Sequence, residues 1–288
     1  MRDPGPFHAG EVEVQRRAGV REAAEQVGRI VRPELTPDVA RVLRELPIAV
    51  AGSIAPGGAV WASPLAGAPG FLRVLDARTL RVDARLRSED PLAANLASDA
   101  PLGLLAIDLA TRRRLRLNGR ARLDAERRIV LTVAQVYGNC PKYIHARQVD
   151  GAEPHSAGAA VARSTSLDAR QRRAVAAADT LFIASHHPEG GADVSHRGGP
   201  RGFVAVAGPR ELVFADYPGN NMFNTLGNLV AEPRAGLLVP DFGSGSALQI
   251  TGRAAVEWAG TTAAVRFAID AVIETPAGFR TRSTEPRR

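Results

Sequence analysis

Residues that commonly bind small anions are concentrated between Ala192 and Asn228. The stretch contains a serine, Ser195, an arginine, Arg197, several glycines, and asparagines at positions 220, 221, 224 and 228. Glycine lets backbone N–H groups approach an anion closely, arginine offers a fork of charge-assisted donors, and asparagine adds neutral donors and acceptors. The stretch therefore predicts an enclosed site for a phosphate-bearing cofactor.

A degraded copy of this stretch lies earlier in the chain. Ten residues between positions 53 and 80 are identical to those 132 positions later, and ten between positions 95 and 121 are identical to those 133 positions later. Average composition would give roughly two or three matches in each window. The chain therefore contains an internal duplication.

The two copies differ in their polar residues. Trp61 stands at the position that corresponds to Asp193, and Leu65 at the position that corresponds to Arg197, whereas the glycines and the apolar strand positions recur. We therefore expect one full cofactor site per chain, built mainly on the second copy.

Short apolar segments separated by proline and glycine turns predict β structure in both copies. In the first copy they cover residues 48–54, 60–65, 70–75 and 80–84. Short strands with tight turns favour a barrel over a parallel sheet, so we predict a mainly β fold, a β-barrel with flanking helices, present twice. The expected boundaries are a helical segment over 1–46, a first barrel over 47–150, a linker over 151–164 and a second barrel over 165–288.

Helices are expected where charge patterns and capping residues occur together. A surface helix is predicted over 11–29, a second over 36–46 with Thr36 as N-cap, and a short one over 90–97. Pro141 and Ser166 are expected to begin two further helices. The tail after residue 274 is expected to be loosely ordered.

The strand predicted over residues 112–123 has two unlike faces. Leu115 and Leu117 share the face that packs into the barrel, whereas Arg114 and Arg116 share the opposite face. Exposure to solvent and contact with a partner's ligand both remain open for these arginines.

Composition restricts the class of protein. The 288 residues carry a net charge of +7, but aromatic residues make up 5% and no basic-aromatic motif for nucleic acid occurs. The positive charge favours anionic small molecules as ligands. A single cysteine, Cys140, excludes an internal disulfide, and no apolar segment is long enough for a signal region or a membrane helix. A cytoplasmic location, with no membrane or nucleic-acid partner, is expected.

Other kinds of site are disfavoured by spacing. His186 and His187 are adjacent on a strand and point to opposite faces, without an acidic or cysteine partner at a metal-ligand spacing. Asp193, Ser195 and His196 are too close along one extended segment to converge as a catalytic triad. We therefore expect no metal site and no hydrolase triad.

The residue pattern of the second copy resembles the pyridoxamine 5'-phosphate oxidase-like FMN-binding split-barrel superfamily. The matching residues are 193–199, 202–204, 219–221, 226–229, 233, 236–238 and 252–254, and residues 7–11 and 139–143 are similar to segments of a two-barrel branch. The resemblance implies tandem duplicated FMN-binding split barrels with FMN in a cleft between them. Because the copies are fused, one chain would supply both walls, and a homodimer remains possible.

The resemblance also implies roles for individual residues. Ser195 and Arg197 would line the flavin and its phosphate, with Asp193 in the same motif. The phosphate-binding segment would contain Asn220, Asn221 and Asn224.

The basic pair of the pyridoxamine phosphate oxidases falls near Asn224 and Thr225, which are neutral here. The missing charge would come from the first half, and the candidates are Lys142, Arg147, Arg114 and Arg116. The catalytic candidates are Lys142, His196 and Tyr217.

Four interpretations follow from this resemblance. The first is an FMN-dependent oxidoreductase acting on an unknown small molecule. The second is a haem-handling split barrel, with His8, His145 or His196 as the axial ligand. The third is a non-catalytic flavin-binding protein, and the fourth places a deazaflavin in the same pocket.

Overall fold

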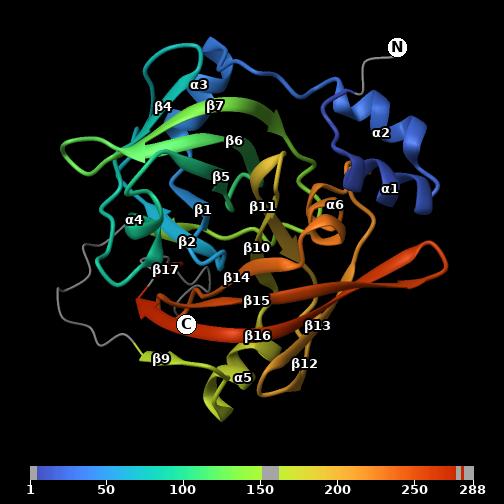
Figure 1. Ribbon diagram of the computed structural model, residues 1–288. Helices are drawn as coiled ribbons and strands as arrows, with labels where there is room; N and C mark the ends of the chain where they lie inside the picture. The colour runs from blue at the N-terminus through green and yellow to red at the C-terminus, as the bar shows by residue number, and fades with distance from the viewer. Residues whose placement is uncertain (1–4, 151–161, 277–279, 282–288) are drawn as a thin grey trace, which may run out of the picture.

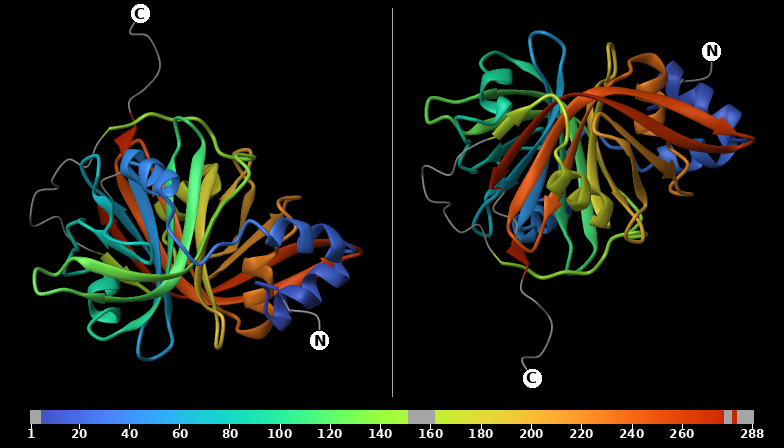
Figure 2. Two further views of the ribbon diagram at one scale, coloured as in Figure 1. Left: turned by 90° about the horizontal axis from the view of Figure 1, so that it is seen from above. Right: turned by 90° about the horizontal axis from the view of Figure 1, so that it is seen from below.

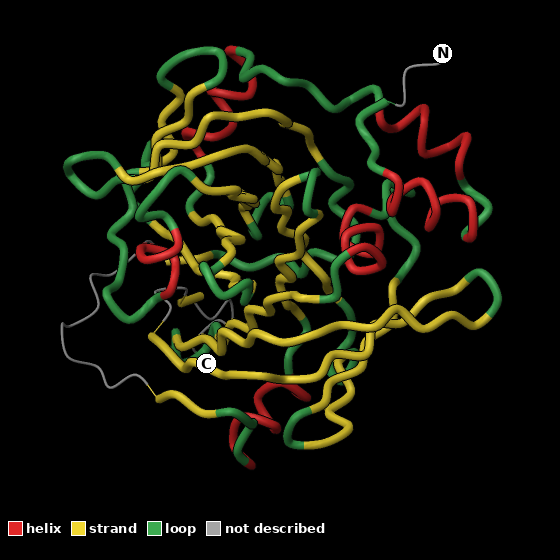
Figure 3. The backbone as a smooth tube through the Cα atoms, viewed as in Figure 1, coloured by secondary structure: helices red, strands yellow, loops and turns green. Residues whose placement is uncertain are grey.

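The computed structural model describes residues 5–150, 162–276 and 280–281. It is dominated by two antiparallel sheets, with short helices at their margins (Figures 1 and 3). The first sheet contains β1 (Ile48–Ile54), β2 (Val60–Ala66), β3 (Leu72–Val74), β4 (Thr79–Val82), β5 (Ala100–Asp108), β6 (Arg113–Leu123) and β7 (Ile129–Gly138). Its spatial order is β2-β1-β5-β6-β7-β4-β3.

The second sheet repeats this arrangement. It contains β10 (Thr180–His187), β11 (Gly191–Gly198), β12 (Val204–Gly208), β13 (Glu211–Asp216), β14 (Arg234–Asp241), β15 (Ser246–Ala259) and β16 (Thr262–Pro276), in the order β11-β10-β14-β15-β16-β13-β12. The short strand β9 (Ala162–Ser164) pairs with β16, and β8 (Val149–Asp150) pairs with β17 (Arg280–Thr281). Matching the two orders relates β1 to β10, β2 to β11 and β6 to β15, so the duplication of the sequence is also a duplication of topology.

Each sheet curls around an apolar core of its own. Leucines and valines such as Leu80, Leu104 and Leu131 fill the first barrel, and Leu181, Leu237 and other large apolar side chains fill the second. Burial of these side chains provides the main driving force for folding each half. The mainly β fold predicted from the sequence is confirmed.

A third apolar cluster joins the two barrels. It combines Val50 and Leu105 of the first half with Phe182 and Leu238 of the second. Figure 2 shows the two barrels side by side from above and below, with the β15–β16 hairpin reaching towards the N-terminal helices. The two barrels, which belong to one chain, therefore also pack against each other through an apolar interface.

Two glycines at equivalent positions permit this close contact. A Cβ atom on Gly103 of β5 would lie 2.7 Å from the Cα atom of Asp193, and a Cβ atom on Gly236 of β14 would lie 2.9 Å from the Cα atom of Trp61. Asp193 and Trp61 themselves occupy equivalent positions, because they pair with Ser185 and Ser53 respectively. The interface thus has an approximate two-fold relation, with different side chains on its two sides.

The helices fit the predictions only in part. The helix predicted over 11–29 is two helices, α1 (Ala9–Arg17) and α2 (Arg21–Gly28), because Gly19 adopts a positive φ of 72° and ends the first. The start of α3 (Pro37–Glu45) is confirmed, with the Thr36 hydroxyl accepting from the Val39 N–H at 3.3 Å. The short helix α4 (Pro91–Asn95) lies within the predicted range.

Two predicted helix starts are wrong. No helix follows Pro141, because Tyr143 adopts a positive φ of 66° that helix geometry does not allow. The cap of α5 (Ala169–Ala177) is Asp168, not Ser166, because Asp168 forms a reciprocal pair of hydrogen bonds with Gln171.

The remaining elements complete the description. Helix α6 (Asn224–Ala231) lies beside β10 in the second half, and α1 packs on it (Figure 1). The tail is ordered further than expected, since β16 continues to Pro276, while residues 277–279 and 282–288 and most of the predicted linker lie outside the described residues. Among the described helices, none is long and apolar enough to cross a membrane.

Candidate active site between the barrels

The polar face of β6 is buried where the first barrel meets the second. Alternation along the strand turns Leu117 into the first core and Arg116 and Asn118 towards β11 of the second half. Arg116 and Asn118 are each 7% exposed. Exposure to solvent is therefore wrong for Arg116, and its contact with a ligand stays a prediction.

Arg116 is the centre of a buried network. One terminal nitrogen lies 3.1 and 2.9 Å from the two carboxylate oxygens of Asp193, and the other lies 2.5 Å from Ser195 Oγ. The first nitrogen also donates to Asn224 Oδ1 at 3.1 Å and to the Tyr137 hydroxyl at 3.4 Å. One guanidinium thus ties strand β11 and helix α6 of the second half to the first barrel.

Electrostatic attraction and hydrogen bonds stabilise the groups of this network in their buried positions. Burial disfavours a charged guanidinium, but the carboxylate of Asp193 outweighs this and raises the pKa of Arg116. Burial also raises the pKa of the Tyr137 hydroxyl, which therefore stays protonated. Ser195 is held in turn by Thr225, with 2.7 Å between their hydroxyl oxygens.

Above this network an open cleft lies between the halves, with about 800 Å³ of empty space including its solvent-facing mouth. We refer to it as the inter-barrel cleft. The first half lines it with Arg114, Arg116, Asn139, Cys140, Lys142 and Tyr143, and the second half with residues 195–198, 203, 215–217, 219–221 and 223–225.

Several buried polar atoms of the lining lack hydrogen-bond partners within the described residues. They are the Nε atoms of Arg114, Arg116 and Arg197, both side-chain atoms of Asn139 and both ring nitrogens of His196. Buried polar atoms in native proteins are normally paired, so seven such atoms around one cleft indicate a binding partner that these residues do not supply.

Of the four arginine and lysine side chains that line the cleft, two form ion pairs with carboxylates. Arg197 forms an ion pair with Asp216, and Arg116 with Asp193. Arg114 donates to the backbone carbonyl of Cys140 at 2.7 Å, and Lys142 lies 5.1 Å from the ring centroid of Tyr143. In the part of the chain that the structure describes, neither Arg114 nor Lys142 forms an ion pair with a carboxylate.

Burial and the crowding of positive charge lower the pKa values of Arg114 and His196. Burial, followed by repulsion from Arg116 and Arg197, lowers the pKa of Arg114 to about 9. Burial, followed by the same kind of repulsion, holds the pKa of His196 well below its usual value, so this imidazole is neutral at pH 7. An anion in the cleft would relieve the repulsion, whereas a cation would add to it.

Backbone strain is concentrated in the same place. Tyr143, Asn221 and Phe223 all have positive φ angles, of 66°, 63° and 58°. The Tyr143 ring stacks on Tyr217 at 5.3 Å, and its hydroxyl donates to the Pro218 carbonyl at 3.2 Å. Such strain persists only where surrounding contacts hold it and is common at ligand sites.

The structure brings most of the predicted site residues together. Eight of the ten candidates for cofactor binding line the inter-barrel cleft, namely Ser195, Arg197, Asn220, Asn221, Asn224, Lys142, Arg114 and Arg116. The three catalytic candidates, Lys142, His196 and Tyr217, line it as well. Asp193 lies beneath the cleft as the partner of Arg116.

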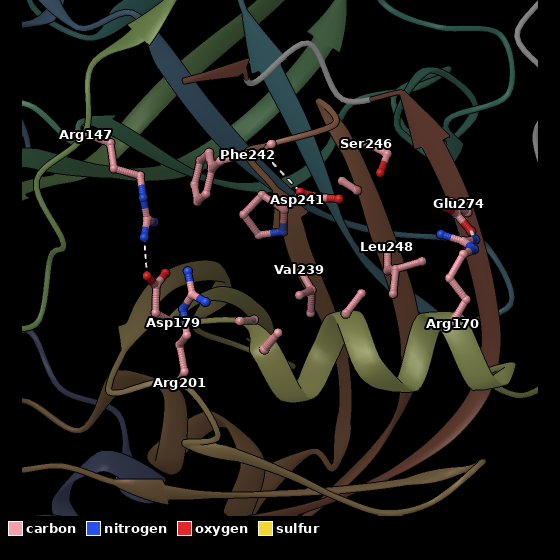
Figure 4. A pocket seen from close by; sticks show the side chains of 16 residues that line it. Arg147, Arg170, Asp179, Arg201, Val239, Asp241, Phe242, Ser246, Leu248 and Glu274 are labelled. Carbon is pink, nitrogen blue, oxygen red and sulfur yellow. Dashed lines mark hydrogen bonds and ion pairs between the residues drawn. The ribbon is translucent and has the colours of Figure 1, made fainter. Parts of the chain in front are cut away.

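Arg147 is the exception, because it faces a different pocket (Figure 4). It forms an ion pair with Asp179 at the start of β10, and its guanidinium lies 4.6 Å from the centroid of Phe242. This second pocket balances Arg147, Arg170 and Arg201 against three acidic side chains, Asp179, Asp241 and Glu274. The absence of a helix after Pro141 explains the difference, since an extended segment carries Arg147 away from Lys142.

Some residues of the site were not among the predicted ones. Asn118 donates to Asp193 at 3.3 Å, Tyr137 contacts Arg116, and Tyr143 lines the cleft and donates to the Pro218 carbonyl. The alternation that placed Arg116 on the polar face of β6 also includes Asn118. The positions of Tyr137 and Tyr143 depend on tertiary contacts that leave no local signal.

Comparison with known proteins found a family model that matches part of the chain. Residues 167–273 match the family described as Pyridoxamine 5'-phosphate oxidase. No curated protein matches the sequence at a significant level.

Several solved structures resemble part of the chain. One is a candidate pyridoxamine 5'-phosphate oxidase from Lactobacillus delbrueckii, with 16% identity and a TM-score of 0.32, covering 38% of this chain and 94% of that one. Another is HupZ from Group A Streptococcus, with 9% identity and a TM-score of 0.33, covering 40% and 98%. A third is an FAD-binding protein from Mesorhizobium loti, with 15% identity and a TM-score of 0.30, covering 41% and 99%. Similarities this low support no inference about function.

Proposed function

We propose, from the match of residues 167–273 to the family described as Pyridoxamine 5'-phosphate oxidase, that the inter-barrel cleft binds FMN and that the protein is a flavin-dependent oxidoreductase acting on a small molecule. The two barrels would form the two walls, one chain supplying both.

The observation that carries this proposal is the unmatched charge and polarity of the cleft. Among the described residues, Arg114 and Lys142 have no carboxylate partner, so they supply two positive charges, and a phosphate monoester carries a charge of about −2 at neutral pH. The Nε atoms of Arg114 and Arg197, which also lack partners there, are donors of the kind that bind phosphate oxygens. The donor set therefore fits a phosphorylated cofactor.

The residues divide into three roles under this proposal. Arg114 and Lys142 bind the phosphate, and Asn220 and Asn221 add neutral hydrogen bonds beside it. Neutral His196 offers a donor and an acceptor without adding charge. Flavin, when bound, supplies the redox chemistry, and the protein orients the reactants and excludes water.

The haem alternative is less well supported by the histidines. His8 Nε2 lies 2.8 Å from Asn228 Oδ1, and His145 Nε2 lies 2.9 Å from the Gly199 carbonyl oxygen. Neither ring nitrogen of His196 has a partner among the described residues, but His196 is 6% exposed and lies edge-on to Phe182. A deazaflavin also carries phosphate and remains an alternative occupant of the same donor set.

The test is an absorption spectrum of the purified protein with and without added FMN, after gel filtration. We expect retained flavin bands, and we expect Arg114→Ala to weaken FMN binding roughly 10- to 100-fold, the loss of one charge-assisted contact of about 1.5–3 kcal/mol. Arg113→Ala is the matched control, because Arg113 directly precedes Arg114 on β6 but pairs with Glu45 outside the cleft. Equal affinities for the two variants, or no FMN retention by the unmutated protein, would rule out this assignment, and the same spectra with haem or a deazaflavin would then identify the occupant.

A further inference from the structure

The segment Phe7–Glu11 lies against the site although it is far from it in sequence. Helix α1 crosses α6 at a contact between two glycines: a Cβ atom on Gly10 would lie 2.3 Å from the Gly227 carbonyl oxygen, and one on Gly227 would lie 2.6 Å from the Glu11 Cα atom. Only glycines at both positions allow this approach. As a result, Glu11 reaches Asn224, which lines the inter-barrel cleft.

Glu11 is buried, with 4% of its surface exposed. Its Oε1 atom accepts a hydrogen bond from Asn224 Nδ2 at 2.5 Å, and its Oε2 atom accepts from the backbone N–H of His8 at 2.8 Å. Burying a carboxyl group in this position costs free energy unless it forms hydrogen bonds with a specific partner. Asn224 is that partner.

The orientation of the Asn224 amide is set from both ends. Arg116 can only donate, so the atom that faces it must be Asn224 Oδ1, at 3.1 Å. The Nδ2 atom must then face an acceptor, and Glu11 provides one. Glu11, Asn224 and Arg116 form a chain of hydrogen bonds that ends at Ser195 in the cleft.

We propose that Glu11 is a positioning residue of the site, which fixes the Asn224 amide and, through it, the Arg116 guanidinium, and whose protonation state sets the charge beneath the cleft. This inference rests on the proposed function for the identity of the ligand, but not for the coupling between Glu11 and Asn224.

The surroundings of Glu11 make its protonation responsive near neutral pH. Burial raises the pKa of Glu11 to about 7, the hydrogen bonds from Asn224 and His8 oppose this, and Asp193 on β11 and Arg116 on β6 act in opposite directions. His8 faces Glu11 from the helix start, with 3.5 Å between Nε2 and Oε2, and stacks on His187 of β10 at 3.9 Å. Burial lowers the pKa of His8, so His8 does not supply a compensating charge.

Deprotonation of Glu11 would therefore add a negative charge beneath a site that attracts an anion. At an effective dielectric constant near 20 and a distance of about 10 Å, one such charge weakens the binding of a single anionic charge on the order of tenfold. We expect the affinity for FMN, relative to that of Glu11→Gln at the same pH, to fall about tenfold between pH 6 and pH 8. The ratio removes the ionisation of the phosphate itself.

The decisive experiment follows the side-chain amide signal of Asn224 by NMR in the ligand-free protein, assigned by its loss in Asn224→Gln. We expect the signal to shift with a midpoint near pH 7 in the unmutated protein and to remain constant in Glu11→Gln, which keeps the acceptor oxygen but cannot titrate. Glu13→Gln, an exposed change on the same helix, should behave as the unmutated protein.

The outcomes separate this inference from the proposed function. An Asn224 signal that is insensitive to pH, or that titrates equally in Glu11→Gln, would overturn the role of Glu11 whether or not FMN binds. A signal that titrates through Glu11 in a protein that does not bind FMN would support the positioning role and contradict the cofactor assignment.

Discussion

Arg116 in the first repeat and Gln249 in the second occupy equivalent strand positions, and each reaches across to the other barrel. Arg116 contacts Ser195 and Asp193, whereas Gln249 Nε2 lies 3.3 Å from Ser63 Oγ and 3.1 Å from Asp90 Oδ2. Ser63 and Ser195 are themselves equivalent. The same geometry therefore supports a network centred on an arginine beside the inter-barrel cleft and a network centred on a glutamine on the other side.

The difference shows what a degenerate site requires. Gln249 is fully buried, its amide has partners, and Trp61 and Leu65 replace Asp193 and Arg197. The amide of Gln249 is paired, whereas polar atoms around the inter-barrel cleft lack partners within the described residues. Unpaired polar atoms, more than the scaffold, distinguish the second copy from the first.

The largest expected effect is the removal of the counterion of Arg116. Asp193→Ala leaves a buried guanidinium without its carboxylate, which should lower the free energy of unfolding by about 3–5 kcal/mol. Chemical denaturation measures this loss. Adding Arg116→Gln, which makes this position resemble Gln249, should restore much of it. A loss below about 1 kcal/mol for Asp193→Ala would mean that the pair is not desolvated.

The next largest expected effect is a pH-dependent loss of stability caused by Glu11 on α1, the helix that packs beside α6 of the second half. Since the pKa of Glu11 is about 7 when folded and near 4.5 when unfolded, the native protein retains a proton that the unfolded chain loses. The contribution is fully present below pH 4.5, declines as the pH rises to about 7, and amounts to about 3 kcal/mol. Denaturation curves from pH 4 to pH 8 should show this decline, and Glu11→Gln should flatten it. An unchanged slope in Glu11→Gln would contradict the assignment.

The two interface glycines provide a smaller and more symmetrical test. Gly103→Ala and Gly236→Ala both force a Cβ atom into the opposite barrel, and each should cost about 1–3 kcal/mol. Only Gly103→Ala displaces Asp193 and with it Arg116, so it alone should weaken FMN binding. Thermal denaturation and FMN titration of both variants separate the two effects, and equal losses of FMN affinity would show that the copies are not functionally distinct.

The smallest effect concerns a hydrogen bond that both copies retain. Asn95 Nδ2 donates to Ser53 Oγ at 2.9 Å, and Asn228 Nδ2 donates to Ser185 Oγ at 3.0 Å. Asn95→Ala should cost about 1 kcal/mol and Asn228→Ala about 2 kcal/mol, because Asn228 also contacts His8. Denaturation midpoints of the two variants measure the difference. The reverse order of stability would show that the contact with His8 contributes nothing.

The repeat pattern predicted much of the fold. Identities at fixed spacing placed Ser53 on Ser185 and Asn95 on Asn228, and these pairs lie on matching strands and helices with the same hydrogen bond. Alternation along β6 also predicted that Arg114 and Arg116 share a face. Such signals survive because apolar periodicity and glycine positions are local consequences of strand packing.

Other features could not be predicted from local signals. Arg147 was assigned to the cofactor site, but its partner Asp179 is 32 residues away and became evident only in the folded chain. Glu11 reaches Asn224 over a separation of 213 residues. The contact between Gly10 and Gly227 that allows this cannot be predicted from the periodicity of the sequence. Pro141 has the form of a helix start, but the contacts of Tyr143 with Pro218 and Tyr217 override that preference.

The covalent fusion of the two barrels affects how the protein can evolve. In a homodimer every substitution appears on both sides of the symmetry axis, so a gain at one interface site is imposed on its twin. Here the positions of Arg116 and Gln249 mutate independently, which lets one pocket keep a charge while the other is filled. Because both walls are tethered in one polypeptide, assembly of the pocket is intramolecular and its formation is independent of protein concentration.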